Sequence, residues 1–328
     1  MTNKEKYIQF CSRAYVPIYS KPWWMDAVCE PEKWDVWIYE SGGNILAAMP
    51  YYIERRGEFR YITKAPLTQN NGIIFNMDRN QNAKVAAQSK FEEHIINEAN
   101  RFIESLSLDV YEQQYHYSFN NWLPFFWNRY TAITRYTYVI DNTFDIEDVW
   151  NGMTPNYRKN IKKGYRIAKV IEGHDIDEFW RLHQKIFEKQ GLECPFQYEL
   201  WMRVYNACLQ NNCGKILYAE DNDNNILSVL FLVWDEQSVY QLLGGSIPAY
   251  QHLQTYNILT WEGIKLASQM GLKYDFEGSV IERFAKSMRQ FGGKPMPYFR
   301  IRKVFNPDII RAEAEEQIQE ICEKNTEK

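Results

Sequence analysis

The chain has 328 residues, of which 45% are hydrophobic and 24% charged, and its formal net charge is −4 at pH 7. This length predicts two domains of roughly 150–180 residues each. The acidic balance excludes a general electrostatic binder of nucleic acid, which is usually basic overall, although a local basic site is still compatible with it. No stretch approaches the roughly 20 apolar residues of a membrane span, and the first residues show no signal sequence, so we expect a cytoplasmic protein.

Cysteine and histidine give no sign of a metal site. The six cysteines form no C-x-x-C pair, and the five histidines lack the spacing of metal ligands. We therefore expect free thiols and no bound metal.

Two segments of the chain resemble each other and indicate an internal repeat. Trp34–Tyr52 and Lys215–Trp234 each consist of an apolar strand, a turn, and a second apolar strand that opens with Asn-Ile-Leu. The turns, Ser41–Gly43 and Asp221–Asn224, supply Gly and Asn, which tolerate the positive φ that tight hairpins require. Both segments are therefore predicted β-hairpins.

The elements that follow each hairpin come in one order: strand, long helix, strand, short helix, strand. After the first hairpin they are predicted near Tyr61–Phe75, Ala83–Leu106, Leu108–Tyr115, Asn120–Trp127 and Tyr130–Ile140. After the second they are predicted near Ser238–Gly244, Thr255–Met270, Leu272–Phe276, Val280–Gln290 and Pro297–Val304. Both long helices have apolar residues at helical spacing, and Gly271 is expected to cap the second one.

We therefore predict an α/β protein with a mixed sheet, built from two tandem copies of one unit, residues 1–145 and 146–328. The second copy has an added helical pair, Ile176–Gln190 and Pro195–Gln210. A final acidic helix is predicted to begin at Asn306-Pro307, with Asn as the cap and Pro at the first helical position.

The stretch Tyr274–Gly293 is the most informative for function. A short strand runs directly into Glu277-Gly278-Ser279, and an amphipathic charged helix follows. A carboxylate and a glycine at the C-terminal end of a strand suit catalysis, because the glycine lets a ligand approach the main chain. Glu277 is the first candidate for a general base, and Asp275 is the reserve because alternate strand residues share a face. The alternative for Glu277 is an ordinary cap of the following helix.

The order of these elements resembles the Gcn5-related N-acetyltransferase (GNAT) fold, present twice. Tandem copies are similar to the FemABX-like acyltransferases, which include the peptidoglycan-bridge aminoacyltransferases and the BioF2-like acetyltransferases. The local motifs that match are Ser20–Trp24, Pro66–Gly72, Met153–Lys163, Tyr274–Ser279 and Phe291–Gly293.

Two motifs depart from the family pattern. The glycine-rich pyrophosphate loop of Gcn5-type enzymes is absent, and its positional equivalent, Tyr250–Thr255, contains no glycine. In the closing motif the expected cation is displaced by one residue, to Arg289. Both departures concern the binding of acetyl-CoA.

The resemblance implies amide formation, in which an amine attacks an activated acyl carbonyl. The donor would be acetyl-CoA or another acyl-CoA, or else an aminoacyl-tRNA, and the acidic net charge favours the thioester. The acceptor would be a small-molecule or nucleotide-linked precursor of the cell envelope or a polysaccharide. Glu277 would take the amine proton, Arg289 would hold a phosphate or the oxyanion, and Tyr256 would protonate the leaving group. Arg289 as a solvated side chain and Tyr256 as a packed aromatic are the alternatives.

A basic segment provides further candidates for substrate binding. Tyr157–Lys169 contains six cations and no acid, and its Arg158 and Lys162 share a helix face. The candidates for substrate binding are Lys21, Trp24, Arg158, Lys162, Gln254 and Ser279. A solvated helix and core packing are the alternatives for this set. A non-catalytic module that binds an anionic sugar nucleotide or RNA is the alternative for the whole chain.

Overall fold

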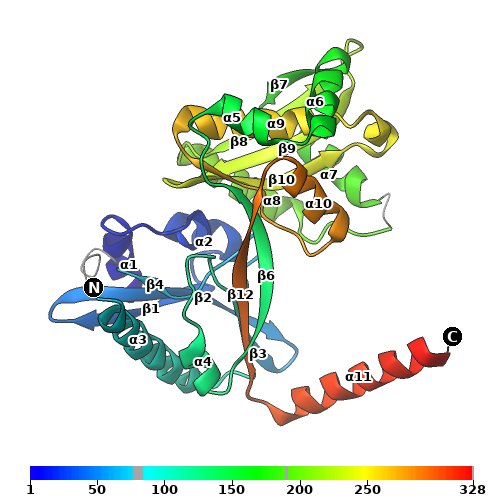
Figure 1. The fold of residues 1–328 in the computed structure, drawn as a ribbon. Helices are drawn as coiled ribbons and strands as arrows, with labels where there is room; N and C mark the ends of the chain where they lie inside the picture. The colour runs from blue at the N-terminus through cyan, green and yellow to red at the C-terminus, as the bar shows by residue number, and fades with distance from the viewer. Residues whose placement is uncertain (77–83, 189–190, 327–328) are drawn as a thin grey trace. The chain divides into compact units, whose positions relative to one another are not determined.

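The computed structural model describes residues 1–76, 84–188 and 191–326, and contacts divide the chain into two compact units. Unit 1 contains Met1–Met25, Cys29–Thr134 and the chain from Tyr298 onward, whereas unit 2 contains Asp26–Val28 and Arg135–Pro297. Figure 1 labels the elements of both. The sequence-based division between residues 145 and 146 concerns the two copies of the repeat and stays a prediction.

Unit 1 holds most of the N-terminal half of the chain. Its elements are α1 (Asn3–Cys11), α2 (Pro22–Cys29), β1 (Trp34–Ser41), β2 (Asn44–Arg56), β3 (Phe59–Thr63), β4 (Ile74–Phe75), α3 (Val85–Ser105), β5 (Val110–Gln114), α4 (Leu123–Trp127) and α11 (Pro307–Thr326). Residues of α2, β6 (Thr131–Ile140) and β12 (Lys294–Val304) are divided between the two units.

The sheet of unit 1 follows the order β1-β2-β3-β5-β12. Strands β1 and β2 form the first predicted hairpin, β3 and β5 are parallel, and β5 pairs with β12 in antiparallel fashion. One face packs against α3, and the core between them includes Ile95, Ala99 and Ile103 of the helix with Ile62, Tyr111 and Ile301 of the strands. The amphipathic pattern of this helix therefore predicted its buried face.

Unit 2 contains the second hairpin and the added helices. Its elements are α5 (Ile146–Gly152), α6 (Pro155–Ile167), β7 (Lys169–Gly173), α7 (Ile176–Glu188), α8 (Tyr198–Gln210), β8 (Gly214–Glu220), β9 (Ile226–Trp234), β10 (Ser238–Ser246), the 3-10 helix Pro248–Leu253, α9 (Tyr256–Met270), β11 (Lys273–Asp275) and α10 (Glu282–Gln290).

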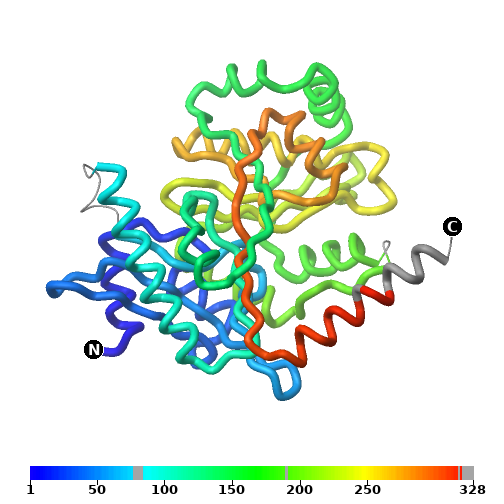
Figure 2. The backbone as a smooth tube through the Cα atoms, turned by 60° about the horizontal axis from the view of Figure 1, so that its bottom comes forward, coloured from blue at the N-terminus to red at the C-terminus, as the bar shows by residue number. Residues whose placement is uncertain are grey.

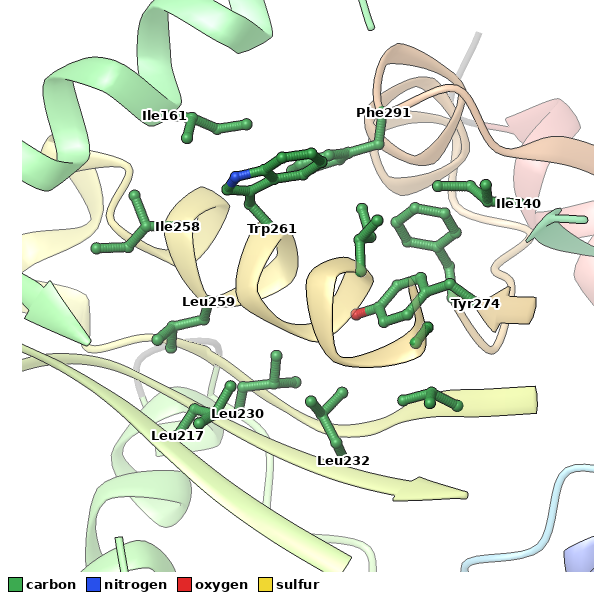
Figure 3. Packing of buried hydrophobic residues seen from close by; sticks show 14 of the residues in the cluster. Ile140, Ile161, Leu217, Leu230, Leu232, Ile258, Leu259, Trp261, Tyr274 and Phe291 are labelled. Atoms are coloured by element: carbon green, nitrogen blue, oxygen red, sulfur yellow. The ribbon is translucent and has the colours of Figure 1, made fainter. Parts of the chain in front are cut away.

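Helices cover both faces of the sheet in unit 2, whose order is β6-β11-β10-β9-β8-β7. On one face, Leu259 of α9 points toward Leu230 of β9, and Trp261 lies on the opposite side of the helix beside Ile161 of α6, as Figure 3 shows; all four belong to one buried cluster. Helix α6 packs beside α9, and the tube in Figure 2 shows both on the same side of the strands. On the other face, Trp201 of α8 stacks on Phe179 of α7 at 4.6 Å and meets Phe231 of β9 at 5.0 Å between ring centroids.

Most of the predicted elements are confirmed. Both hairpins, both long helices and the added helical pair lie where the sequence places them, and Gly271 caps α9 in the left-handed region. The predicted start of α11 is also confirmed, since the Asn306 side chain accepts a hydrogen bond of 2.9 Å from the Asp308 N–H. Ala83 and Gln190, at the ends of two predicted helices, lie outside the described residues.

Two predictions of local structure were incomplete. The strand predicted near Tyr61–Phe75 is two short strands, β3 and β4, because Pro66 and the positive φ of Gly72 (113°) interrupt the extended chain. The sequence analysis also missed α1, α2, α5 and β7. No helix among the described residues has the length and apolar character needed to cross a membrane.

Candidate active site

The predicted site lies in unit 2, where strands β10 and β11 part. The two strands run parallel, and their register covers Ser238↔Lys273, Val239↔Tyr274 and Tyr240↔Asp275. Beyond Tyr240, β10 continues to Ser246 alongside β9, and the β9–β10 register shifts between Gln241 and Leu243. The β10–β11 pairing therefore ends at Asp275, and the carboxyl end of parallel strands in an α/β sheet is the position at which a site is expected.

Three polar side chains of β10, β11 and α9 are linked by hydrogen bonds near this position. The Tyr274 hydroxyl donates to Gln241 Oε1 at 2.6 Å, and Gln241 Nε2 donates to the Tyr256 hydroxyl at 3.1 Å. The Tyr256 oxygen acts as an acceptor in this chain, so its own O–H is available to donate elsewhere. Burial raises the pKa of Tyr256 well above its usual range, although the hydrogen bond with Gln241 offsets part of the shift. Tyr256 is therefore a protonated phenol at neutral pH.

Asp275 is a buried carboxylate at the end of β11. The side chain has no solvent exposure. Its Oδ1 accepts hydrogen bonds from the Thr137 hydroxyl of β6 and, at 2.8 Å, from the Glu277 N–H. Its Oδ2 is buried without a hydrogen-bond partner among the described residues. Burial is the main cause that raises the pKa of Asp275 to about 7, and the bonds from Thr137 and Glu277 lower it in part.

Glu277 and Gly278 form a strained turn held by Asp275. Both residues have left-handed backbone conformations, with φ of 66° and 69°. At Gly278 a Cβ would lie 2.3 Å from the Tyr136 carbonyl oxygen, so only glycine fits this position. A non-glycine residue such as Glu277 at positive φ costs of order 1 kcal/mol and is concentrated at functional sites. Glu277 is half-buried. Strand β11 ends at Asp275, so Glu277 lies beyond the strand, and the side-chain alternation that was predicted to place Asp275 and Glu277 on one face does not extend to Glu277.

The loop before α9 makes a left-handed turn without glycine. Gln254 ends the 3-10 helix with φ 57°, the left-handed conformation that a glycine would normally supply. The side chain of Gln254 is exposed, and Thr255 is fixed below it by a hydroxyl–hydroxyl bond of 2.8 Å to Ser228. The absence of glycine from Tyr250–Thr255 therefore does not prevent this turn.

The remaining candidates in the closing motif lie on α10 or just before it. Ser279 is half-buried, and its hydroxyl accepts a hydrogen bond of 3.1 Å from the Ile281 N–H. Arg289 is exposed in the last turn of α10. Neither position by itself assigns the residue to a ligand.

Several cations of the basic segment make contacts within unit 2. Arg158 Nη1 donates to the carbonyl oxygens of Asn151 and Met153 at 2.8 and 2.6 Å, which stabilises the C-terminal end of α5. Lys162 lies 5.8 Å from the Trp150 ring centroid, and Lys169 pairs with Glu220 at 2.8 Å. The exposed cations of this segment are Lys159, Lys162, Lys163, Arg166 and Lys169.

The two N-terminal candidates belong to unit 1. Trp24 is completely buried, and its indole N–H donates to the Thr68 hydroxyl at 3.0 Å. A side chain without exposed surface cannot stack on a ligand, so in this structure Trp24 is a core residue. Lys21 is half-buried immediately before α2.

Two surface hollows lie away from these residues. One of about 390 Å³ in unit 1 is lined by Arg56, Arg300 and Arg302 together with Glu112 and Glu313, and another of about 490 Å³ lies beside β7 in unit 2. The arginines pair with carboxylates in the first, as Lys215 does with Glu172 at 3.0 Å in the second. Because their charges are already compensated, neither hollow attracts an anionic substrate strongly. Among the described residues, no group of three or more His, Cys, Asp or Glu side chains could hold a metal ion.

Comparison with known proteins identifies the fold. Residues 155–285, which include α9, β11 and the Glu277 turn, match the model of the acetyltransferase (GNAT) domain. A crystal structure of FemX is similar over 95% of this chain and 98% of its own, with a TM-score of 0.67 and 11% identity. The chain has the tandem GNAT fold of the FemABX-like proteins. The fold predicted from the sequence is thereby confirmed, and the matched GNAT domain indicates an N-acyltransferase.

Other solved structures share this fold. The C-terminal domain of a putative lysylphosphatidylglycerol synthetase from Agrobacterium fabrum is similar over 97% of both chains, with a TM-score of 0.55 and 10% identity. A conserved protein of unknown function from Bacteroides thetaiotaomicron is similar over 86% of this chain and 88% of its own, with a TM-score of 0.56 and 8% identity. No curated protein matched the sequence.

Sequence reasoning missed three residues of this site: Gln241, Tyr274 and Thr137. Gln241 is a polar residue within an otherwise apolar strand, and that irregularity was an available signal. The contribution of Thr137 had no such signal, because it depends on β6 lying beside β11.

The elevated pKa of Asp275 predicts an unusual dependence of stability on pH. Because the native pKa is near 7 and the ordinary value is 3.8, the folded chain binds more protons than the unfolded chain between these values. The free energy of unfolding should therefore fall as pH rises through this interval, by up to about 1.4 kcal/mol per pH unit. Urea unfolding at several pH values should show that Asp275→Asn loses this slope, whereas the exposed Asp308→Asn keeps it. Equal slopes in all three proteins would show that Asp275 has an ordinary pKa.

Arg158 is predicted to act on stability. Arg158→Ala removes a charged donor from two carbonyl oxygens and should lower the free energy of unfolding by about 1–3 kcal/mol. Lys159→Ala, a substitution of its exposed neighbour, should change it by less than about 0.5 kcal/mol. Chemical denaturation of both variants checks this. If the Arg158→Ala variant is as stable as wild type but no longer binds a phosphate-bearing ligand, Arg158 is a binding residue instead.

Proposed function

We propose that this chain forms an amide by transferring an acyl group from an acyl-CoA, such as acetyl-CoA, to an amine. The acceptor proposed is a small-molecule or nucleotide-linked precursor of the cell envelope or a polysaccharide, and the reaction is placed in the cytoplasm. The observation that supports the proposal is the end of the β10–β11 pairing, where Tyr274, Gln241 and Tyr256 are linked by hydrogen bonds and Asp275 anchors the Glu277 turn.

Glu277 is proposed as the general base. The amine nitrogen attacks the acyl carbon, the carbon–sulfur bond breaks, and the proton lost by nitrogen passes to the Glu277 carboxylate. Asp275 is a positioning residue, because it holds the Glu277 N–H and so fixes the direction of the turn. A fixed turn reduces the conformational freedom that the base would otherwise lose on reaching its catalytic position.

Tyr256 is proposed as the acid for the leaving group. Its raised pKa keeps the phenol protonated, and its O–H is not used in the bond with Gln241. The thiolate released from the donor can take this proton; Glu277 then releases the amine proton to solvent, and the phenol recovers one from solvent. The products are the amide and the free thiol, so the protons balance.

The distribution of cations supports an acyl-CoA donor. Of the basic segment, Arg158 is engaged with α5 and Lys169 with Glu220, which leaves a small group of exposed cations on α6. Such a group suits a few phosphates. A transfer RNA generally requires a broad basic surface, and the whole chain has a net charge of −4.

The second candidate is an aminoacyl-tRNA-dependent transferase of the peptidoglycan-bridge type. It is favoured by the fold shared with FemX and with the domain of a putative lysylphosphatidylglycerol synthetase. A non-catalytic binding module on the same scaffold is the third. The absence of glycine from Tyr250–Thr255 suggested this third candidate, and the left-handed conformation of Gln254, which needs no glycine, argues against it.

Glu277→Gln is predicted to lower kcat by about 10²–10⁴-fold with a smaller effect on KM, because it removes the base and leaves the turn intact. Release of the thiol from acetyl-CoA, measured against a panel of amine acceptors, checks this. Glu282→Gln is the matched control, since Glu282 is exposed at the start of α10. Unchanged turnover in Glu277→Gln would remove Glu277 from catalysis.

Calorimetry separates the three candidate functions. Binding of acetyl-CoA supports the acyl-CoA enzyme, and binding of aminoacyl-tRNA alone supports the second candidate. If neither donor binds but an anionic sugar nucleotide does, the chain is a binding module.

A further inference from the structure

Three large apolar side chains project into solvent at the start of α10. The exposed fractions of Val280, Ile281 and Phe284 are 72%, 50% and 43%. The same helix has a separate inward face, where Ala285 and Met288 pack against the core of unit 2. The exposed residues therefore do not serve the core, and clusters of this kind mark interaction sites more often than singly scattered apolar residues do.

Ile281 is an unusual residue for its position in the helix. It is the N-cap of α10, and its side chain makes no capping hydrogen bond. Ser, Thr, Asp and Asn are preferred there because their side chains accept from the N–H groups of the first turn. An exposed isoleucine at this position contributes neither a cap nor core packing, which points to a role outside the fold.

Cations accompany these apolar side chains. Arg283, Lys286 and Arg289 lie on α10, and Glu282 is the acid of the helix and pairs with Lys286 at 2.5 Å. The guanidinium of Arg283 lies 4.7 Å from the centroid of the Phe284 ring. Apolar tips beside long cationic side chains are typical of helices that lie at a membrane surface, where the tips enter the interface and the cations meet lipid phosphates.

We propose that Val280–Arg289, here called the docking segment, binds unit 2 to an anionic phospholipid surface. The net charge of the segment is positive, in contrast to the chain as a whole, so it complements anionic headgroups. A protein partner fits less well, because a stable protein interface uses roughly 20–30 residues on each side and this patch offers three apolar side chains. The proposal does not depend on the reaction inferred above.

Co-sedimentation of the full chain with phospholipid vesicles tests this proposal. Wild-type protein should sediment with phosphatidylcholine vesicles that contain about 30% phosphatidylglycerol and remain in solution with phosphatidylcholine alone. The triple variant Val280→Ser/Ile281→Ser/Phe284→Ser should bind anionic vesicles at least tenfold more weakly. Arg283→Gln/Lys286→Gln should weaken vesicle binding roughly fivefold for each cation removed. Raising the salt concentration should also weaken vesicle binding of the wild-type protein.

A matched control uses apolar residues that are exposed elsewhere. Val85→Ser/Ile310→Ser changes two such side chains in unit 1 and should leave vesicle binding unchanged. Amide hydrogen exchange tests the wild-type protein directly. The amides of the docking segment should exchange more slowly when anionic vesicles are added. Wild-type protein that stays in solution with anionic vesicles, or equal binding by the triple variant, would overturn the proposal, and capture of a protein by this segment without vesicle binding would do the same.

Discussion

The arrangement of the site depends on one buried carboxylate. Asp275 ends β11, accepts the Thr137 hydroxyl from β6, and accepts the main-chain N–H of Glu277. These bonds fix the left-handed turn that Gly278 continues, where the chain passes too close to Tyr136 for any side chain. Since a buried carboxylate with an unsatisfied oxygen is costly, its presence here is better explained by the turn that it holds than by stability.

Two groups of polar side chains with different chemical characters lie where the β10–β11 pairing ends. On the α9 side, Tyr274, Gln241 and Tyr256 form a chain of neutral hydrogen bonds that ends in a phenol able to donate. At the end of β11, Asp275 holds the turn that carries Glu277, the residue proposed to accept the amine proton. Acyl transfer to an amine requires both an acid and a base, and the proposed function assigns these roles to Tyr256 and Glu277.

Much of this fold could be predicted from the sequence, because hairpins and amphipathic helices have local signals. The second hairpin, α9 and the left-handed Gly271 are examples. Contacts between distant segments had no such signal. The basic composition around Arg158 suggested binding but did not indicate its contact with the end of α5, and the aromatic content around Trp24 did not indicate that its indole is buried against Thr68. Charge and aromatic content indicate what a side chain can do, whereas packing decides which of these it does.

Titration of Asp275 tests the central claim most directly. In protein labelled with ¹³C-aspartate, the carboxyl carbon of Asp275 should titrate with a midpoint of about 7, as its burial implies. Thr137→Val removes a hydrogen bond that lowers the pKa, so the midpoint should rise further in that variant. A midpoint close to the ordinary value of 3.8, unaffected by Thr137→Val, would contradict the account, because Asp275 would then be a solvated carboxylate that does not hold the Glu277 turn.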